Sequence, residues 1–262
     1  MSERFVERPV KMTFQETIEY FNEGIKSAEI FRTLAKSSKL QIEQCYALDL
    51  LQINAARFKQ ASIQRADEDA ANMFLAYECA IGAVRSELLM LILLKRDMPN
   101  EAWDQLIAAQ MGCMDASRAH TGFAHCQQRL EDLNQYEGLV FPPQAFMSVG
   151  FLSDSLDCSI CDKPYANCQH LRGKPYMGRF CEINHRNPRG DHAALVDIPA
   201  DKRCRVTSVQ VREGHMDKLS GEITPYENNE MYDEEGPLLA QTILMAMHRY
   251  PYLTSSSQVL GG

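Results

Sequence analysis

The chain has 262 residues, and its 35 Asp and Glu against 27 Lys and Arg give a net charge of −8. A field of this sign disfavours non-specific binding of the whole chain to nucleic acid or to anionic membranes. Hydrophobic residues make up 45% of the sequence, which is enough for a folded domain with a buried core. The longest apolar run, 88–94, is far shorter than the roughly 20 residues that span a bilayer. We therefore expect no membrane association.

The first half of the chain shows the apolar spacing of helices. Thr13 and Glu16 match a capping box, which predicts a helix start at this point. Apolar residues then recur at three- and four-residue steps. We expect helices in the ranges 13–35, 40–64, 67–95 and 100–133, with a break in the last one near Thr121-Gly122. The third is apolar nearly all round toward its end, so we expect it at the centre of an antiparallel bundle formed by residues 1–140.

After Pro142-Pro143 the pattern changes to short runs that favour strands. Expected strands are 146–149, 193–198 and 205–211, in a small α+β module that covers residues 141–220. Residues 221–262 predict an acidic connector, a final helix over 237–250 and a loose tail. The expected fold class is mainly α, with a small zinc-stabilised α+β module.

A cysteine cluster gives this second module its chemistry. Cys158 and Cys161 are followed by Cys168 and His170 within thirteen residues, and Cys181 lies eleven residues further on. Two thiolates two residues apart can hold one cation across a tight turn, and a second Cys/His pair can complete a tetrahedron around Zn²⁺. We expect four of these five residues to bind the metal, with either His170 or Cys181 as the fourth ligand.

The same ligand set indicates the role of the ion. A catalytic zinc keeps three protein ligands and one open position, whereas a shell of four protein ligands is closed. We therefore expect one structural Zn²⁺. The N-terminus has no apolar signal core, so we expect a reducing cytoplasm, where clustered cysteines are metal ligands more often than disulfides.

A second polar stretch, His185-Arg-Asn-Pro-Arg-Gly-Asp-His192, follows the cysteines. Its His, Asn and His after a Cys-x2-Cys pair resemble HNH-type nucleases. The resemblance implies a ββα unit with a catalytic metal, an activating His at the end of a strand and a last His on a helix. Here the residues after His192 predict a strand, which departs from that pattern. The alternative interpretation is a polar loop beside the zinc module.

The module is locally basic. Between residues 162 and 218 there are eleven Lys and Arg against seven Asp and Glu, a net charge of +4. Phosphate backbones bind such surfaces, and so do acidic proteins. For the nucleic-acid alternative the candidate residues are Lys163, Arg172, Lys174, Arg179, His185, Arg186, Arg189 and His192.

The sequence contains no complete catalytic constellation. The leading hypothesis is therefore a non-enzymatic zinc-binding adaptor or assembly subunit that binds a protein partner or associates with itself. The alternative is a nucleic-acid-binding or HNH-like nuclease zinc protein that uses the basic module 158–218.

Overall fold

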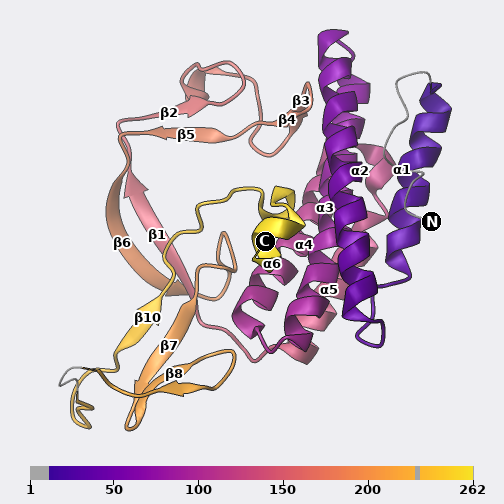
Figure 1. The fold of residues 1–262 in the computed structure, drawn as a ribbon. Coiled ribbons are helices and arrows are strands. Elements are labelled where there is room, and N and C mark those ends of the chain that lie inside the picture. Colours follow the sequence, from indigo (N-terminus) through magenta and orange to yellow (C-terminus); the bar gives the residue numbers. More distant parts are fainter. Residues whose placement is uncertain (1–11, 228–230, 262) are drawn as a thin grey trace.

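Five helices pack side by side in the computed structural model, which describes residues 12–227 and 231–261 (Figure 1). The expected start of the first bundle segment, residues 1–11, and part of the expected acidic connector, residues 228–230, lie outside the described residues. The helices are α1 (Phe14–Glu29), α2 (Ser38–Gln64), α3 (Glu68–Lys95), α4 (Pro99–Ala119) and α5 (Cys126–Val140).

Helix α3 forms the centre of the bundle, as its sequence predicts. Nearly every side chain from Ala70 to Leu93 is buried, and the helix packs against both α2 and α4. A helix that is apolar on all sides is stable only when other helices surround it. The predicted capping box at the start of α1 is confirmed, with the Thr13 hydroxyl accepting from the Glu16 N–H at 3.2 Å.

The predicted break in the fourth helix is also confirmed. Helix α4 ends at Ala119, and a short 3-10 turn, Thr121–Phe123, leads into α5. The turn is stabilised by His120, whose Nδ1 accepts a hydrogen bond from the Gly122 N–H at 3.1 Å. Helix α5 then runs to Val140, beyond the expected end at residue 133.

The second half of the chain forms short antiparallel ribbons beside the bundle (Figure 1). The strands pair as β1–β6, β2–β5 and β3–β4, and the others form a sheet in the order β10-β7-β8-β9. All three expected strands are present, although they belong to two different sheets. The strands are β1 (Phe146–Leu152), β2 (Ser155–Cys158), β3 (Pro175–Tyr176), β4 (Arg179–Phe180), β5 (Ile183–Arg186), β6 (Arg189–Val196), β7 (Val206–Val211), β8 (Gly214–Asp217), β9 (Ile223–Thr224) and β10 (Ala240–Thr242).

The expected final helix over 237–250 is wrong. Residues 240–242 form β10, which extends the sheet alongside β7. Backbone hydrogen bonds from the Gln210 N–H to the Leu239 carbonyl and from the Ile243 N–H to the Arg205 carbonyl hold it there. The edge of β7 therefore provides hydrogen-bond partners for the backbone of this segment. Side chains such as Leu238 and Met247 stay exposed and do not form a packed helical stripe. A short helix, α6 (Ser256–Leu260), occurs where a loose tail was expected.

The C-terminal segment, residues 250–260, returns to the bundle (Figure 1, yellow). The Tyr252 side chain is 1% exposed, and its hydroxyl donates to the Asp115 carboxylate at 2.7 Å. Arg85 of α3 donates to the carbonyl groups of Tyr252 and Thr254, each at 2.6 Å. Tyr250, Tyr252 and Leu253 of this segment line a cavity together with residues of α2, α3 and the second half of the chain.

Among residues 12–227 and 231–261, no helix has the combination of length and apolar character that crossing a membrane requires.

Candidate metal centre

The first two cysteines sit on a tight turn at the end of β2. The Cys158 N–H donates to the Lys163 carbonyl, and the Asp162 N–H donates to the Cys158 carbonyl, both at 2.9 Å. Asp162 has a φ of 55°, a left-handed conformation that Asp adopts more readily than most residues. The turn brings Cys161 back beside Cys158, as the two-residue spacing requires.

The second pair follows a 3-10 turn, Tyr165–Asn167. Two tyrosines hold the loop that carries His170, because the Tyr176 hydroxyl accepts from the Leu171 N–H at 2.9 Å and the Tyr165 hydroxyl accepts from the Arg172 N–H at 3.0 Å. The ring of Tyr176 also packs edge-on against the His170 imidazole, with centroids 4.6 Å apart. These contacts restrict the orientation of the imidazole.

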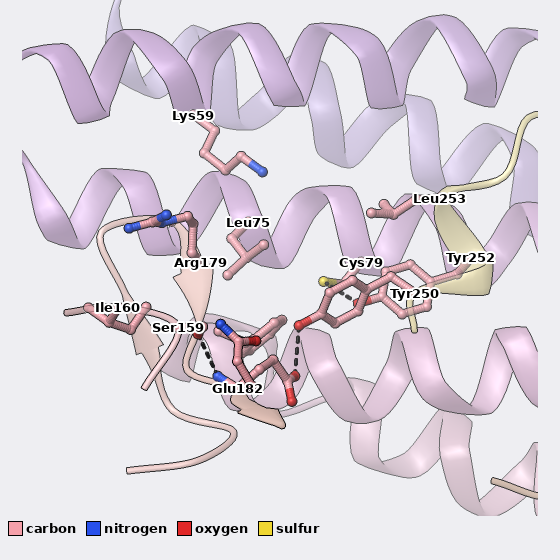
Figure 2. A pocket seen from close by; sticks show the side chains of 13 residues that line it. Lys59, Leu75, Cys79, Ser159, Ile160, Arg179, Glu182, Tyr250, Tyr252 and Leu253 are labelled. Atoms are coloured by element: carbon pink, nitrogen blue, oxygen red, sulfur yellow. Dashed lines mark hydrogen bonds between the residues drawn. The ribbon is translucent and has the colours of Figure 1, made fainter. Parts of the chain in front are cut away.

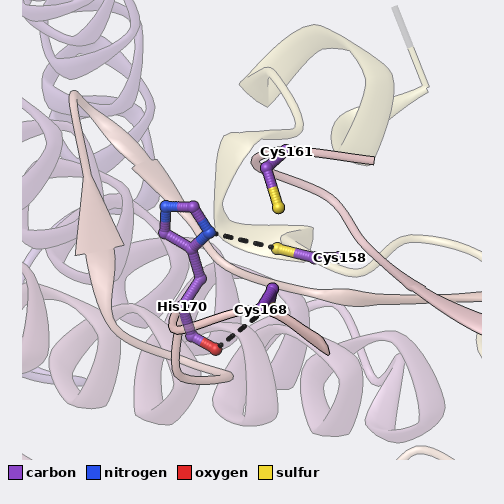
Figure 3. Close-up of side chains that lie close together, drawn as sticks. All are labelled: Cys158, Cys161, Cys168 and His170. Atoms are coloured by element: carbon purple, nitrogen blue, oxygen red, sulfur yellow. Dashed lines mark hydrogen bonds between the residues drawn. The ribbon is translucent and has the colours of Figure 1, made fainter. Parts of the chain in front are cut away.

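These two pairs converge into a Cys3His cluster that could bind a metal ion (Figure 3). The ligand atoms of Cys158, Cys161, Cys168 and His170 all lie within 4.8 Å of one another, and the Cys158 Sγ lies 3.6 Å from the His170 Nδ1. A tetrahedral zinc with Zn–S bonds of about 2.3 Å separates its sulfurs by roughly 3.8 Å. The cluster therefore has the dimensions of such a site.

Cys181 lies next to this cluster without belonging to the group of four. It follows the β3–β4 hairpin and is fully buried, with its Sγ 3.7 Å from the Cys158 Sγ. Its N–H donates to the Lys174 carbonyl at 2.9 Å. The sequence left either His170 or Cys181 as the fourth ligand. In the structure, both side chains contact the Cys158 sulfur.

The surroundings of the two buried thiols differ. Burial raises the pKa of Cys158, but hydrogen bonds from the Ile160 and Cys161 N–H groups and from neighbouring thiols outweigh it, so the pKa is lowered. For Cys181, burial and the hydrogen bond to Cys158 both raise the pKa. The thiolate is the metal-binding form, so the lowered pKa of Cys158 favours the binding of a cation by this sulfur. All nine cysteines of the chain are free of disulfides.

The β3–β4 hairpin, which follows the cluster in the chain, is attached to the bundle through α3. The Met177 N–H donates to the Glu68 carboxylate at 3.2 Å, and the Gly178 N–H donates to the Asn72 side chain at 2.8 Å. On the other side, the Glu182 carboxylate accepts from the Tyr250 hydroxyl at 2.8 Å. No local sequence pattern predicts these contacts, because the partners are separated by 68 residues or more.

The two histidines of the nuclease resemblance occupy different strands. His185 lies on β5, where its Nδ1 is 2.8 Å from the Ser153 hydroxyl. His192 lies on β6, where its Nδ1 is 2.9 Å from the Asp191 carboxylate. Within the described part of the chain, neither belongs to a group of three or more side chains that could hold a metal. As the sequence indicated, His192 is part of a strand.

The eleven basic residues of the module have different surroundings. Five form ion pairs with acidic side chains, Arg205 is buried, and Lys218 is half-buried. The ion pairs are Arg186–Asp157, Arg189–Asp154, Lys202–Glu137, Arg203–Asp201 and Arg212–Glu234. Four others, Lys163, Arg172, Lys174 and Arg179, lie in the chain segment 163–179, are exposed, and take part in none of the ion pairs among the described residues.

Chemically, the cluster offers soft sulfur donors and one imidazole, the donors typical of zinc sites. Three of the exposed cations, Lys163, Arg172 and Lys174, precede the β3–β4 hairpin, and Arg179 lies on β4. No known protein family, no curated protein and no solved structure matches this chain.

Proposed function

We propose that the protein is a non-enzymatic adaptor or assembly subunit whose second half is organised by one structural Zn²⁺. The observation that carries the proposal is the convergence of Cys158, Cys161, Cys168 and His170 within 4.8 Å. Four protein ligands fill a tetrahedral shell and leave no position for a reactive water. The ion would join the turn after β2 to the loop that carries Cys168 and His170. It would thereby stabilise a part of the chain that has few buried side chains of its own.

The surface of the ribbons supports a role in protein association. Several large apolar side chains on or beside β1 and β6 are exposed, among them Leu152 at 58%, Leu195 at 68% and Ile198 at 90%. The register places Leu152 opposite Arg189 and Leu195 opposite Met147, so a partner that covered these side chains would lie along the length of the β1–β6 ribbon. A zinc-braced ribbon would hold this surface in one conformation, which reduces the entropy lost on binding.

The test is the metal content of protein purified without a metal-affinity tag, measured by mass spectrometry together with the native mass. We expect one zinc per chain. Cys161→Ser should lose the zinc and unfold the ribbons while the bundle stays helical, because metal-binding energy is folding energy for such a site. Cys204→Ala is the matched control, since Cys204 is a buried thiol outside the cluster. A Cys161→Ser protein that kept its zinc and its melting curve would refute the proposal.

Cobalt substitution distinguishes the two candidates for the fourth ligand. The thiolate-to-cobalt absorption grows with the number of sulfurs bound. If His170 is the ligand, His170→Ala should weaken metal binding strongly and Cys181→Ala should leave the spectrum unchanged. If Cys181 is the ligand, Cys181→Ala should remove one thiolate contribution and His170→Ala should remove none.

The second candidate function is nucleic-acid binding. It is supported by the exposure of Lys163, Arg172, Lys174 and Arg179 in the chain segment 163–179, where they take part in none of the ion pairs among the described residues. If all four contact phosphates, the logarithm of the affinity for single-stranded DNA should fall with the logarithm of salt concentration with a slope of about −3. Fluorescence anisotropy with a labelled oligonucleotide measures this slope. An affinity that is unmeasurable at low salt would eliminate this candidate.

A further inference from the structure

A cavity lies at the junction between the bundle and the metal-binding ribbon (Figure 2). Its volume is about 350 Å³, which is within the range of small-molecule sites. Three parts of the chain form its walls: helices α2 and α3, the turn and strands next to the cysteines, and the C-terminal segment that begins at Tyr250. None of the residues that line it belongs to the Cys3His cluster.

The walls of the cavity are mainly apolar. Leu75 from α3, Ile160 from the metal-binding turn and Leu253 from the C-terminal segment contribute aliphatic surface. Phe180 and Tyr250 add two aromatic rings whose centroids lie 6.0 Å apart at an interplanar angle of 31°. Flat aromatic groups and branched apolar groups both pack favourably on such a surface.

The charged side chains in the wall leave one positive charge without a partner. Lys59 pairs with Glu78, and Glu182 pairs with Arg249 at 3.3 Å. Arg179 is exposed, and it takes part in none of the ion pairs formed within the described ranges 12–227 and 231–261. Figure 2 shows Arg179 and Lys59 on the same side of the cavity. The wall therefore carries a net charge of +1, and this charge lies at one end of an apolar surface.

We propose that this cavity binds a small aromatic organic anion. The apolar body of the ligand packs between Leu75, Phe180 and Leu253, and its carboxylate, sulfonate or phosphate pairs with Arg179. A single negative charge balances the wall, whereas a second one would lie near the Glu182 carboxylate. Because Ile160 is two residues from Cys158, the ligand also touches the ribbon that the cluster organises.

The probe for this site is 8-anilinonaphthalene-1-sulfonate, an aromatic monoanion whose fluorescence rises in apolar surroundings. N-phenyl-1-naphthylamine is its uncharged counterpart. We expect the anion to bind with a stoichiometry of one by titration calorimetry. Arg179→Glu should weaken the anion about tenfold, the effect of about 1.4 kcal/mol, and should leave the uncharged probe unchanged. Leu253→Trp should fill the cavity and abolish the binding of both probes.

The matched control is Arg172→Glu, which makes the same charge change on an exposed residue that precedes the β3–β4 hairpin and does not line the cavity. Its effect on the anion should stay within about twofold, the small effect expected of an exposed charge. Equal losses in the two Arg variants would overturn the proposal, and so would undiminished binding to Leu253→Trp. Displacement of the probe by 2-naphthoate supports a free small acid as the natural ligand class. Displacement only by a short peptide with Trp beside Asp would overturn that assignment.

The zinc content of each variant separates this test from that of the structural zinc. Arg179, Arg172 and Leu253 are not ligand candidates, so each variant should keep the wild-type metal content. Loss of probe binding with unchanged metal therefore concerns the cavity alone. Loss of zinc in Cys161→Ser concerns the cluster.

Discussion

Arg85 connects the C-terminal segment to the bundle, and its removal should destabilise the protein strongly. Its side chain is 1% exposed and lies in the middle of α3. It donates to the Asp49 carboxylate and to the Gln52 side chain, each at 2.6 Å. Its other terminal nitrogen donates to the carbonyl oxygens of Tyr252 and Thr254. One guanidinium thus joins α2, α3 and the C-terminal segment.

The substitution Arg85→Met keeps much of the side-chain volume and removes all four of these hydrogen bonds. The Asp49 carboxylate, 16% exposed, would keep the Ser256 N–H as a donor, and the Thr254 carbonyl would lose the Arg85 donor. Breaking a buried ion pair by removing one partner costs about 3–5 kcal/mol. In a chain of this size each kcal/mol corresponds to about 2–4 °C in Tm. We therefore expect Tm to fall by about 6–20 °C.

Arg212→Met is the control for this experiment. It makes the same chemical change in the Arg212–Glu234 pair, whose side chains are 71% and 69% exposed. Exposed pairs contribute less than about 1 kcal/mol. Thermal unfolding followed by far-UV circular dichroism measures both variants. Limited proteolysis with intact-mass readout should show the first cleavage of Arg85→Met between residues 250 and 261. Equal melting temperatures for the two variants would refute this account of the C-terminal segment.

Two further predictions concern the same half of the protein. Gly82→Ala should also loosen the C-terminal segment, because its Cβ would overlap the Tyr252 carbonyl oxygen; unchanged proteolysis would contradict this. Burial raises the pKa of Asp104 to about 6, and Arg203 and Arg205 only partly offset it. The folded pKa lies above the unfolded value, so stability should fall as the pH rises from about 4 to about 6. Asp104→Asn should therefore be about 2 kcal/mol more stable than the wild type at about pH 8 and equal to it near pH 4, measured by urea unfolding. Other charged groups that act on Asp104 are Asp201 and Glu101.

The helices and the cysteine cluster were predictable because their signals are local. The apolar spacing of α3 repeats within one helix, and the capping box of α1 spans four residues. Likewise, Cys158, Cys161, Cys168 and His170 lie within thirteen residues of one chain segment. A short loop keeps such side chains close whatever the rest of the chain does.

The helix predicted for residues 237–250 is wrong because the backbone of this segment forms hydrogen bonds with β7, a strand that is distant in sequence. Leu239, Ile243 and Met247 recur at four-residue steps, the spacing of a helical stripe, but the pairing of β10 with β7 determines the conformation. Leu239 and Met247 remain 53% and 82% exposed. Helix propensity is a weak preference that tertiary contacts override, and the open edge of β7 could not be inferred from residues 237–250 alone.

The docking of the C-terminal segment is hidden for a different reason. Arg85 and Gln52 bind its backbone carbonyls, which every residue type carries, so these contacts place no requirement on the side chains of residues 252–254. The sequence feature that corresponds to this docking lies in α3, at Gly82. Gly82 lies in the interior of α3, where glycine costs about 1 kcal/mol relative to alanine. That cost is offset because a Cβ there would exclude the Tyr252 carbonyl. A glycine inside an otherwise apolar helix is therefore the sequence feature from which the approach of another chain segment could have been inferred.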